Sequence, residues 1–113
     1  MIKSMTLIKR KPGLSREEFV KHYEEVHALL ALKHFPTFKR YVRNYVIAPP
    51  DAEEPDLDCI TEIWFDDIEG AVAVTEALGD YKTEVGRIFL DDEERFMDRG
   101  GRVSLVVDER VSK

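Results

Sequence analysis

The stretch KPGLSREEFVKHYEEVHALLALKHFPTF, residues 11–38, contains a complete helix signal and all three histidines of the 113-residue chain. Ser15 and Glu18 form a Ser-x-x-Glu capping box, in which each side chain accepts a hydrogen bond from a backbone N–H at the helix start. The apolar residues that follow recur at helical spacing: Phe19, Tyr23, Val26 and Leu30. The pattern ends after about Lys33, at FPTF. The stretch therefore predicts one amphipathic helix with a buried stripe along those apolar residues.

Segments with the composition of β-strands lie on both sides of this helix. Residues 2–9 alternate in polarity before it, and KRYVRNYVIA, CITEIWF and RVSLVVDER follow it. A second helical region extends from about Ile68 to Met97, with a break near Gly79. The resulting order, β-α-β-β-α-β, predicts an α+β ferredoxin-like fold, in which both helices cover one face of a four-stranded antiparallel sheet.

This arrangement leaves the other face of the sheet uncovered. The alternate strand positions that we expect on this open face are Leu7, Val42, Val46, Cys59, Thr61 and Ile63. A small domain commonly buries such a face against a second copy related by a twofold axis. We therefore expect a homodimer that forms through the open sheet face.

Composition excludes several classes of function. The net charge of −6 and the pI of about 5.1 argue against nucleic-acid binding, which needs clustered Lys and Arg. Cys59 is the single cysteine and has no cationic neighbour, so we interpret it as a packing residue. The N-terminal residues lack the apolar run of a signal peptide, and no segment approaches the ~18 apolar residues of a membrane span. We expect a single domain, 1–113, that is soluble and cytoplasmic.

The three histidines could reflect a metal site, an acid–base site or chance. In a regular helix His22 and His27, five residues apart, point in different directions. Two histidines that bind one metal ion from the same helix need i, i+3 or i, i+4 spacing. His27 and His34 are ~10 Å apart along the helix axis, too far to share one ion. We therefore expect no metal.

An acid–base site is the stronger hypothesis, because imidazole moves protons near neutral pH. His27 borders the buried stripe beside Tyr23. The strand residues that we expect to face it are Tyr41, Arg43 and Tyr45, with Ile60, Glu62 and Trp64. Together they would wall a small-molecule pocket. In the purely structural alternative, His27 is hydrogen-bonded to a backbone carbonyl and the aromatic residues belong to the core or an interface. Glu62 then forms an ion pair with Arg43.

Four segments taken together resemble the EthD-type domain of the dimeric α/β-barrel superfamily: KRKPGLSREEFVKHYEEVHA, RYVRNYV, EIWFDDIE and DDEERFMD. The most specific part is F-x-x-H-Y-x-x-x-H-A-x-L, from Phe19 to Leu30. Leu29 replaces the proline frequent in that family, which predicts an uninterrupted helix. The resemblance implies a pocket between sheet and helices in each subunit of a dimer, and proton transfer without metal, nucleotide or other cofactor. It matches the helix histidine of the family to His27, and His22 also fits the pattern.

These arguments lead to a specific hypothesis about function. We expect a cofactor-independent lyase or isomerase, of the dehydratase, cyclase or decarboxylase type, acting on a small oxygenated aromatic or polyketide-like molecule. His27 would transfer the proton, Tyr41 or Tyr45 would donate a hydrogen bond to the developing enolate, and Glu62 or Tyr23 would orient the imidazole. The further expected substrate contacts are Tyr23, His22, His34, Tyr45 and Trp64.

Three alternatives stay open at this point. The first is a cofactor-free oxidoreductase, similar to monooxygenases of ether or aromatic degradation, which would use the same base. The second is a dimeric module that binds a small ligand without chemistry. The third is an interaction protein whose sheet face is its only function, and this one predicts that no cleft exists between the sheet and the first helix.

Overall fold

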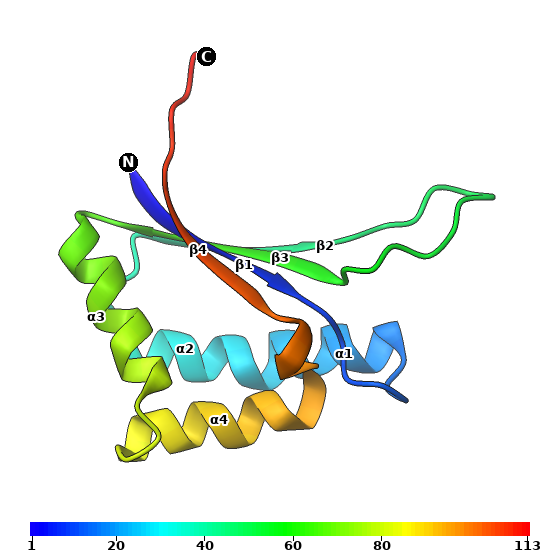
Figure 1. The fold of residues 1–113 in the computed structure, drawn as a ribbon, viewed down its shortest axis with the longest axis horizontal. Coiled ribbons are helices and arrows are strands. Elements are labelled where there is room, and N and C mark those ends of the chain that lie inside the picture. The colour runs from blue at the N-terminus through cyan, green and yellow to red at the C-terminus, as the bar shows by residue number, and fades with distance from the viewer.

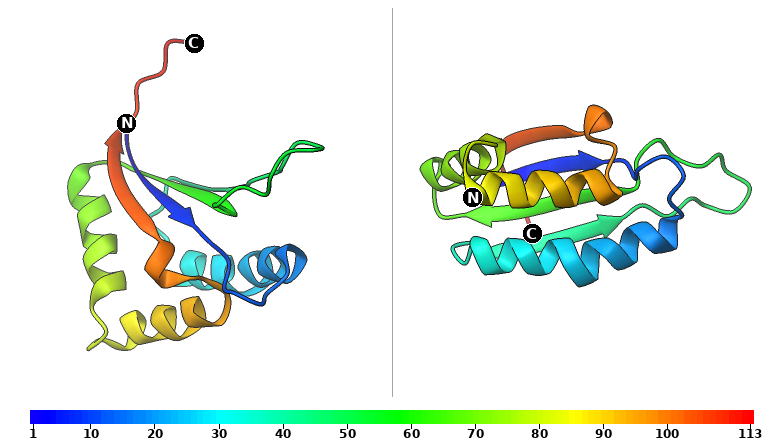
Figure 2. Two further views of the ribbon diagram at one scale, coloured as in Figure 1. Left: turned by 45° about the vertical axis from the view of Figure 1, so that its right-hand side comes forward. Right: turned by 90° about the horizontal axis from the view of Figure 1, so that it is seen from below.

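Four antiparallel strands form a single sheet in the computed structural model, which describes residues 1–113. The strands are β1 (Ile2–Ile8), β2 (Arg40–Tyr45), β3 (Cys59–Phe65) and β4 (Val103–Asp108). Their order across the sheet is β2-β3-β1-β4, with β1 and β3 in the centre. The helices lie on one side of the sheet, and the other side is open (Figures 1 and 2). The predicted ferredoxin-like α+β fold is confirmed.

The helical segments form two groups along the chain. The first comprises α1 (Arg16–His22), the π-helical segment η1 (Tyr23–His27) and α2 (Ala28–His34). The second comprises α3 (Ile68–Gly79), α4 (Glu84–Phe96) and the 3-10 turn η2 (Arg99–Gly101). The predicted break at Gly79 is the end of α3. None of these helices combines the length and the apolar character that crossing a bilayer requires.

The predicted capping box begins α1. The Ser15 side chain accepts a hydrogen bond from the Glu18 backbone N–H at 3.1 Å, and the Glu18 carboxylate accepts one from the Ser15 N–H at 3.2 Å. Both bonds satisfy N–H groups that have no partner within the helix. The start of the first helix was therefore readable from the sequence.

The predicted buried stripe holds only for the first half of this helix. Phe19 and Tyr23 are buried, but Val26 is 38% exposed, and the buried positions that follow are His27, Ala28 and Ala31. The reason is the π-helical segment η1, whose i→i+5 turn contains one more residue than an α-helical turn. The buried positions after it are therefore shifted by one residue. The helix continues through Leu29, which lies in α2. The π-helical turn therefore comes before the position at which the family often has proline.

The sheet register shows which side chains face the helices. Thr61 of β3 lies opposite Thr6 on β1 and Arg43 on β2, so side chains at these positions share the helix-facing side. By the same alternation Glu62 and Trp64 lie on the open face. The assignment of β3 was therefore wrong: Cys59, Thr61 and Ile63 face the helices, and Ile60, Glu62 and Trp64 do not. CITEIWF is largely apolar on both sides, so its pattern does not identify the buried face. A shift of one residue then assigns every side chain of the strand to the opposite face of the sheet.

Two hydrophobic clusters hold the helices on the sheet. The larger cluster consists of Ile8, Phe19, Tyr23, Ala28, Cys59, Phe96 and Met97. The smaller one consists of Phe65, Ala71 and Val74. Burial raises the pKa of the Cys59 thiol to about 11, which keeps the thiol protonated within the larger cluster. The space between the two clusters is not filled by side chains, and it forms the cavity described next.

Candidate active site

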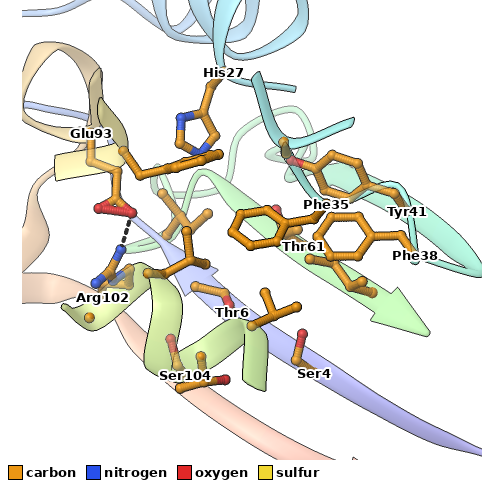
Figure 3. Close-up of a pocket in the computed structure, with 18 of the residues that line it drawn as sticks. Ser4, Thr6, His27, Phe35, Phe38, Tyr41, Thr61, Glu93, Arg102 and Ser104 are labelled. Atoms are coloured by element: carbon orange, nitrogen blue, oxygen red, sulfur yellow. Dashed lines mark hydrogen bonds and ion pairs between the residues drawn. The ribbon is translucent and has the colours of Figure 1, made fainter. Parts of the chain in front are cut away.

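A cavity of about 340 Å³ lies between the helix-facing side of the sheet and the helices. Its wall is mostly apolar, with aromatic rings from Phe35, Phe38 and Phe89. The polar side chains on the wall are Ser4, Thr6, Tyr23, His27, Tyr41, Thr61, Thr75, Glu93, Arg102 and Ser104. Figure 3 shows the His27 ring directed into this space. The volume and composition are those of a small-molecule site.

His27 is held in place from both sides. Its ring packs against Tyr23, Phe89 and Phe96, with centroids 5.4, 5.5 and 5.0 Å away. Its Nδ1 lies 2.9 Å from Oδ2 of Asp92, and the residue is 7% exposed. Nε2 forms no hydrogen bond within the chain and is not fully buried. This nitrogen is therefore available to a molecule in the cavity.

Asp92 on α4 is the partner that orients this imidazole. The residue is 1% exposed, and its carboxylate contacts His27 Nδ1 and, at 2.8 Å, His22 Nε2. Burial alone would raise the pKa of Asp92, but hydrogen bonds from His27 and His22 hold it below its ordinary value. An ionised carboxylate can only accept hydrogen bonds, so Nδ1 of His27 is the donor. In the neutral ring the lone pair is then on Nε2, on the cavity side.

The π-helical segment explains how two histidines reach one carboxylate. Residues five apart diverge in a regular α-helix, and on that basis we expected His22 and His27 to point apart. The i→i+5 geometry of η1 brings both rings to Asp92, so this expectation was wrong. Single π-turns inside α-helices are frequent at functional sites. His22 does not line the cavity and supports Asp92 from the outer side.

A pair of phenols lies beside the histidine. The Tyr23 hydroxyl is 2.6 Å from Oγ1 of Thr61, and the Tyr41 hydroxyl is 3.5 Å from the Tyr23 oxygen. Burial raises the pKa of Tyr41 to about 12 and raises that of Tyr23 as well. Both groups therefore stay neutral near pH 7. Because the contact of Tyr41 is long, its hydroxyl proton can be donated to a bound oxygen atom.

Comparison with known proteins agrees with this architecture. The family model of the EthD domain matches residues 11–100. This chain belongs to the EthD domain family. A search of curated protein sequences finds no significant match.

Solved structures share the fold of this EthD domain at low sequence identity. An ethyl tert-butyl ether D (EthD) family protein from Bacillus halodurans is 18% identical, with a TM-score of 0.68, over 97% of this chain and 100% of that one. An EthD-like protein from Ralstonia eutropha is 14% identical, with a TM-score of 0.69, over 99% and 94%. A dimeric ferredoxin-like protein of unknown function from Bacteroides fragilis is 11% identical, with a TM-score of 0.60, over 96% and 95%. At these identities the likeness shows the fold alone.

The EthD domain places three of the eight predicted site residues on the cavity wall: Tyr23, His27 and Tyr41. Tyr45 lies outside it, where its hydroxyl donates to Glu24, the carboxylate that also accepts two 2.8 Å bonds from Arg43. The expected Glu62–Arg43 pair is therefore replaced by Glu24–Arg43. His34, at the end of α2, stacks edge-on against Phe89 behind the wall.

Glu62 and Trp64 belong to a separate network on the open face. Lys3 Nζ lies 2.6 Å from Glu62 and 2.8 Å from Glu109, whose carboxylate also accepts the Trp64 indole N–H at 2.7 Å. The sheet stands between this network and His27. The proposed role of Glu62 in orienting the imidazole was therefore wrong, since Asp92 occupies that place.

Sequence reasoning missed Asp92, Glu93 and Arg102. A signal was present in α4, where Phe89, Asp92, Glu93 and Phe96 follow i, i+3, i+4, i+7 spacing. Two acidic residues on the apolar stripe of an amphipathic helix are buried and need partners. Applied to DDEERFMD, that rule would have drawn attention to both carboxylates. The partner of each could not be read from the sequence.

Proposed function

We propose that this EthD domain is a cofactor-independent enzyme that moves a proton at a carbon atom next to a carbonyl group. One observation carries the proposal. His27 is fixed through Nδ1 by a buried carboxylate, and its other nitrogen opens onto a cavity of about 340 Å³. A histidine needed only for packing has no reason to border such a space with an unpaired nitrogen.

The proposed first step is the removal of a proton from carbon. The His27 Nε2 lone pair takes the proton, and the electron pair of the C–H bond moves to the carbonyl oxygen to form an enolate. Asp92 stabilises the imidazolium that results, as the carboxylate of a catalytic triad does. The neutral Tyr41 hydroxyl donates a hydrogen bond to the enolate oxygen. Proton transfer of this kind contributes ~10²–10⁴-fold to rate.

The proposed second step returns the proton and defines the reaction type. Delivery by Nε2–H to another carbon of the delocalised enolate completes an isomerisation. Delivery to a departing β-hydroxyl, while the enolate electron pair forms a C=C bond, releases water and completes a dehydration. Attack of the enolate on a second carbonyl, with the proton going to that oxygen, completes a cyclisation. All three outcomes use the same groups.

The lining supports an aromatic or ring-forming substrate. Phe35, Phe38 and Tyr41 supply rings at one end of the cavity, where flat molecules can stack (Figure 3). The existence of the cavity is inconsistent with the interaction-protein hypothesis, which predicted that none exists. Binding of a ligand without chemistry is the alternative outcome of the experiment below.

The experiment is hydrogen–deuterium exchange of enolisable aryl ketones in D₂O, followed by proton NMR. With 2-tetralone and benzoylacetone as probes, the wild type should accelerate exchange above buffer. His27→Gln should lose ~10²–10⁴-fold of that acceleration. His34→Gln is the matched control, because this histidine lies outside the cavity. If the probes bind and no exchange is accelerated, the domain is a binding module and the enzymatic proposal is wrong.

We also propose that the open sheet face joins two copies in a homodimer. Exposed apolar side chains of β4, Val103 and Leu105, continue the apolar surface of Met5 and Leu7 on β1. A flat face of this kind is commonly buried by a twofold partner. Sedimentation should find a dimer for the wild type and a folded monomer for Met5→Glu. A wild-type monomer at micromolar concentration would contradict the proposal.

A further inference from the structure

A group of cationic and hydroxyl side chains forms one end of the cavity, away from the aromatic end. Figure 3 shows Glu93 and Arg102 on one side of His27, with Tyr41 and Phe38 on the other. Glu93 is 5% exposed, and its Oε1 lies 2.6 Å from Arg102 Nη1. Arg102 follows η2 directly and borders the cavity.

The carboxylate partner of Arg102 is shared with a second arginine. Glu93 is also paired with Arg99, whose Nε lies 3.4 Å from Oε2, so two guanidinium groups share one carboxylate. Arg99 Nε is moreover the one fully buried side-chain nitrogen or oxygen atom that lacks a hydrogen bond. Arg102 is the one lysine or arginine on the cavity wall, and Glu93 is the one carboxylate. Arg99 does not itself line the cavity, but it shares Glu93 with Arg102, so this carboxylate neutralises Arg102 only in part.

The guanidinium also keeps unused donors. Within the chain Arg102 forms its hydrogen bond through Nη1 alone, which leaves the N–H groups of Nη2 and Nε without protein partners. Ser104 and Thr6, directly opposite each other in the β1–β4 register, add hydroxyls with no partner in the chain. A planar fork of N–H donors beside hydroxyl groups fits the two oxygens of a carboxylate.

We infer that this end is a subsite for an anionic group, and that the substrates of the domain are aryl carboxylic acids. Arg102 and Ser104 hold the carboxylate, the apolar remainder extends toward Phe35 and Phe38, and His27 lies over the middle of the molecule. The inference rests on the proposed function for the chemistry, but the subsite itself concerns binding and can be tested without turnover.

The test compares two probes of the same shape, 2-naphthoate and its neutral amide 2-naphthamide, by calorimetry at neutral pH. The wild type should bind naphthoate at least about tenfold more tightly than naphthamide, and the difference should shrink as salt is added. Arg102→Gln should remove the preference. Arg102→Lys should keep part of it, because lysine supplies the charge without the fork. Arg110→Gln is the matched control, since Arg110 is exposed and pairs only with Asp108.

Several results would contradict the proposal of an anionic subsite. They are equal affinities for the two probes, an equal loss of preference in Arg110→Gln, and no binding of naphthoate at millimolar concentration. If Arg102→Gln does not fold, the wild-type comparison and Arg102→Lys still decide the matter. Because binding is measured at equilibrium, a missing preference leaves the proton-transfer proposal intact. A failure of ketone exchange with the preference present would contradict the proton-transfer proposal alone.

Discussion

The two faces of the sheet both place polar groups among apolar side chains, yet they differ in how those groups are paired. On the open face Lys3 is matched to two carboxylates, and one of these also accepts the Trp64 indole N–H. On the helix-facing side Nε2 of His27 has no hydrogen-bond partner in the chain, and the Tyr41 hydroxyl makes only a long 3.5 Å bond to the Tyr23 oxygen; both residues line the cavity. Fully paired groups stabilise a structure, whereas incompletely paired groups beside a cavity are available to a ligand. The charge or the rarity of a residue type would not by itself have shown which face of the sheet holds the candidate site.

The largest expected effect on the cavity side comes from Asp92→Asn. An amide can donate its N–H to Nδ1 and so place the ring proton on Nε2, which removes the base as effectively as mutation of His27. Ketone exchange should fall by ~10²–10⁴-fold. Asp91→Asn is the control, since that neighbour is exposed. Full activity of Asp92→Asn in the folded state would show that the buried carboxylate does not orient the base.

A smaller effect is expected from Tyr41→Phe. Loss of one donor to the developing oxyanion should lower the exchange rate by ~10²-fold, with little change in probe affinity. Because the pKa of Tyr41 is about 12, the wild-type rate should show no tyrosine ionisation between pH 6 and about 10. Tyr45→Phe, on β2 and outside the cavity, should be close to wild type. Equal losses in both variants would mean that the cavity position of Tyr41 has no special role.

On the open face the expected effect is on stability and not on proton transfer. Lys3→Met removes the cation shared by Glu62 and Glu109, and the free energy of unfolding should fall by about 1–2 kcal/mol. The ketone exchange rate of the folded protein should not change. Urea unfolding and the exchange assay on one preparation measure both quantities. A tenfold loss of exchange in Lys3→Met would break the separation of the two faces.

The smallest expected effect is a pH dependence of stability. The pKa of Asp92 is lowered in the folded state, so its contribution is present above the ordinary value of 3.8 and is lost as pH falls through the folded value. Urea unfolding of the wild type and Asp92→Asn between pH 6 and about 3 should show their difference shrinking in acid. A difference that grows as pH falls would have the opposite sign and would contradict the pairing.

Particular residues show how far sequence reasoning extends. The capping box at Ser15 and the break at Gly79 are local signals, and the structure confirms both. The faces of β3 were assigned wrongly, because CITEIWF offers apolar residues on both sides and only pairing with β1 decides. The partner of His27 lies 65 residues away on another helix, so helix geometry within 11–38 could not identify Asp92.

The π-turn is the other feature that could not be predicted. A regular helix places His22 and His27 on different flanks and puts Val26 in the buried stripe, but one widened turn reverses both results. The widened turn accompanies tertiary contacts that lie outside the helix itself, since Asp92 and Phe96 of α4 contact both rings. A resemblance in sequence indicated the histidine that lines the cavity, but it did not indicate this geometry.

The most direct test of the central claim is the protonation pattern of the His27 ring, read from long-range ¹H–¹⁵N NMR spectra of the labelled protein. We predict that the neutral ring carries its proton on Nδ1, and that the Nε2 resonance is the one displaced when 2-naphthoate or 2-tetralone is added. A neutral ring protonated on Nε2, or an Nε2 chemical shift that stays unchanged when these ligands are added, would contradict the account.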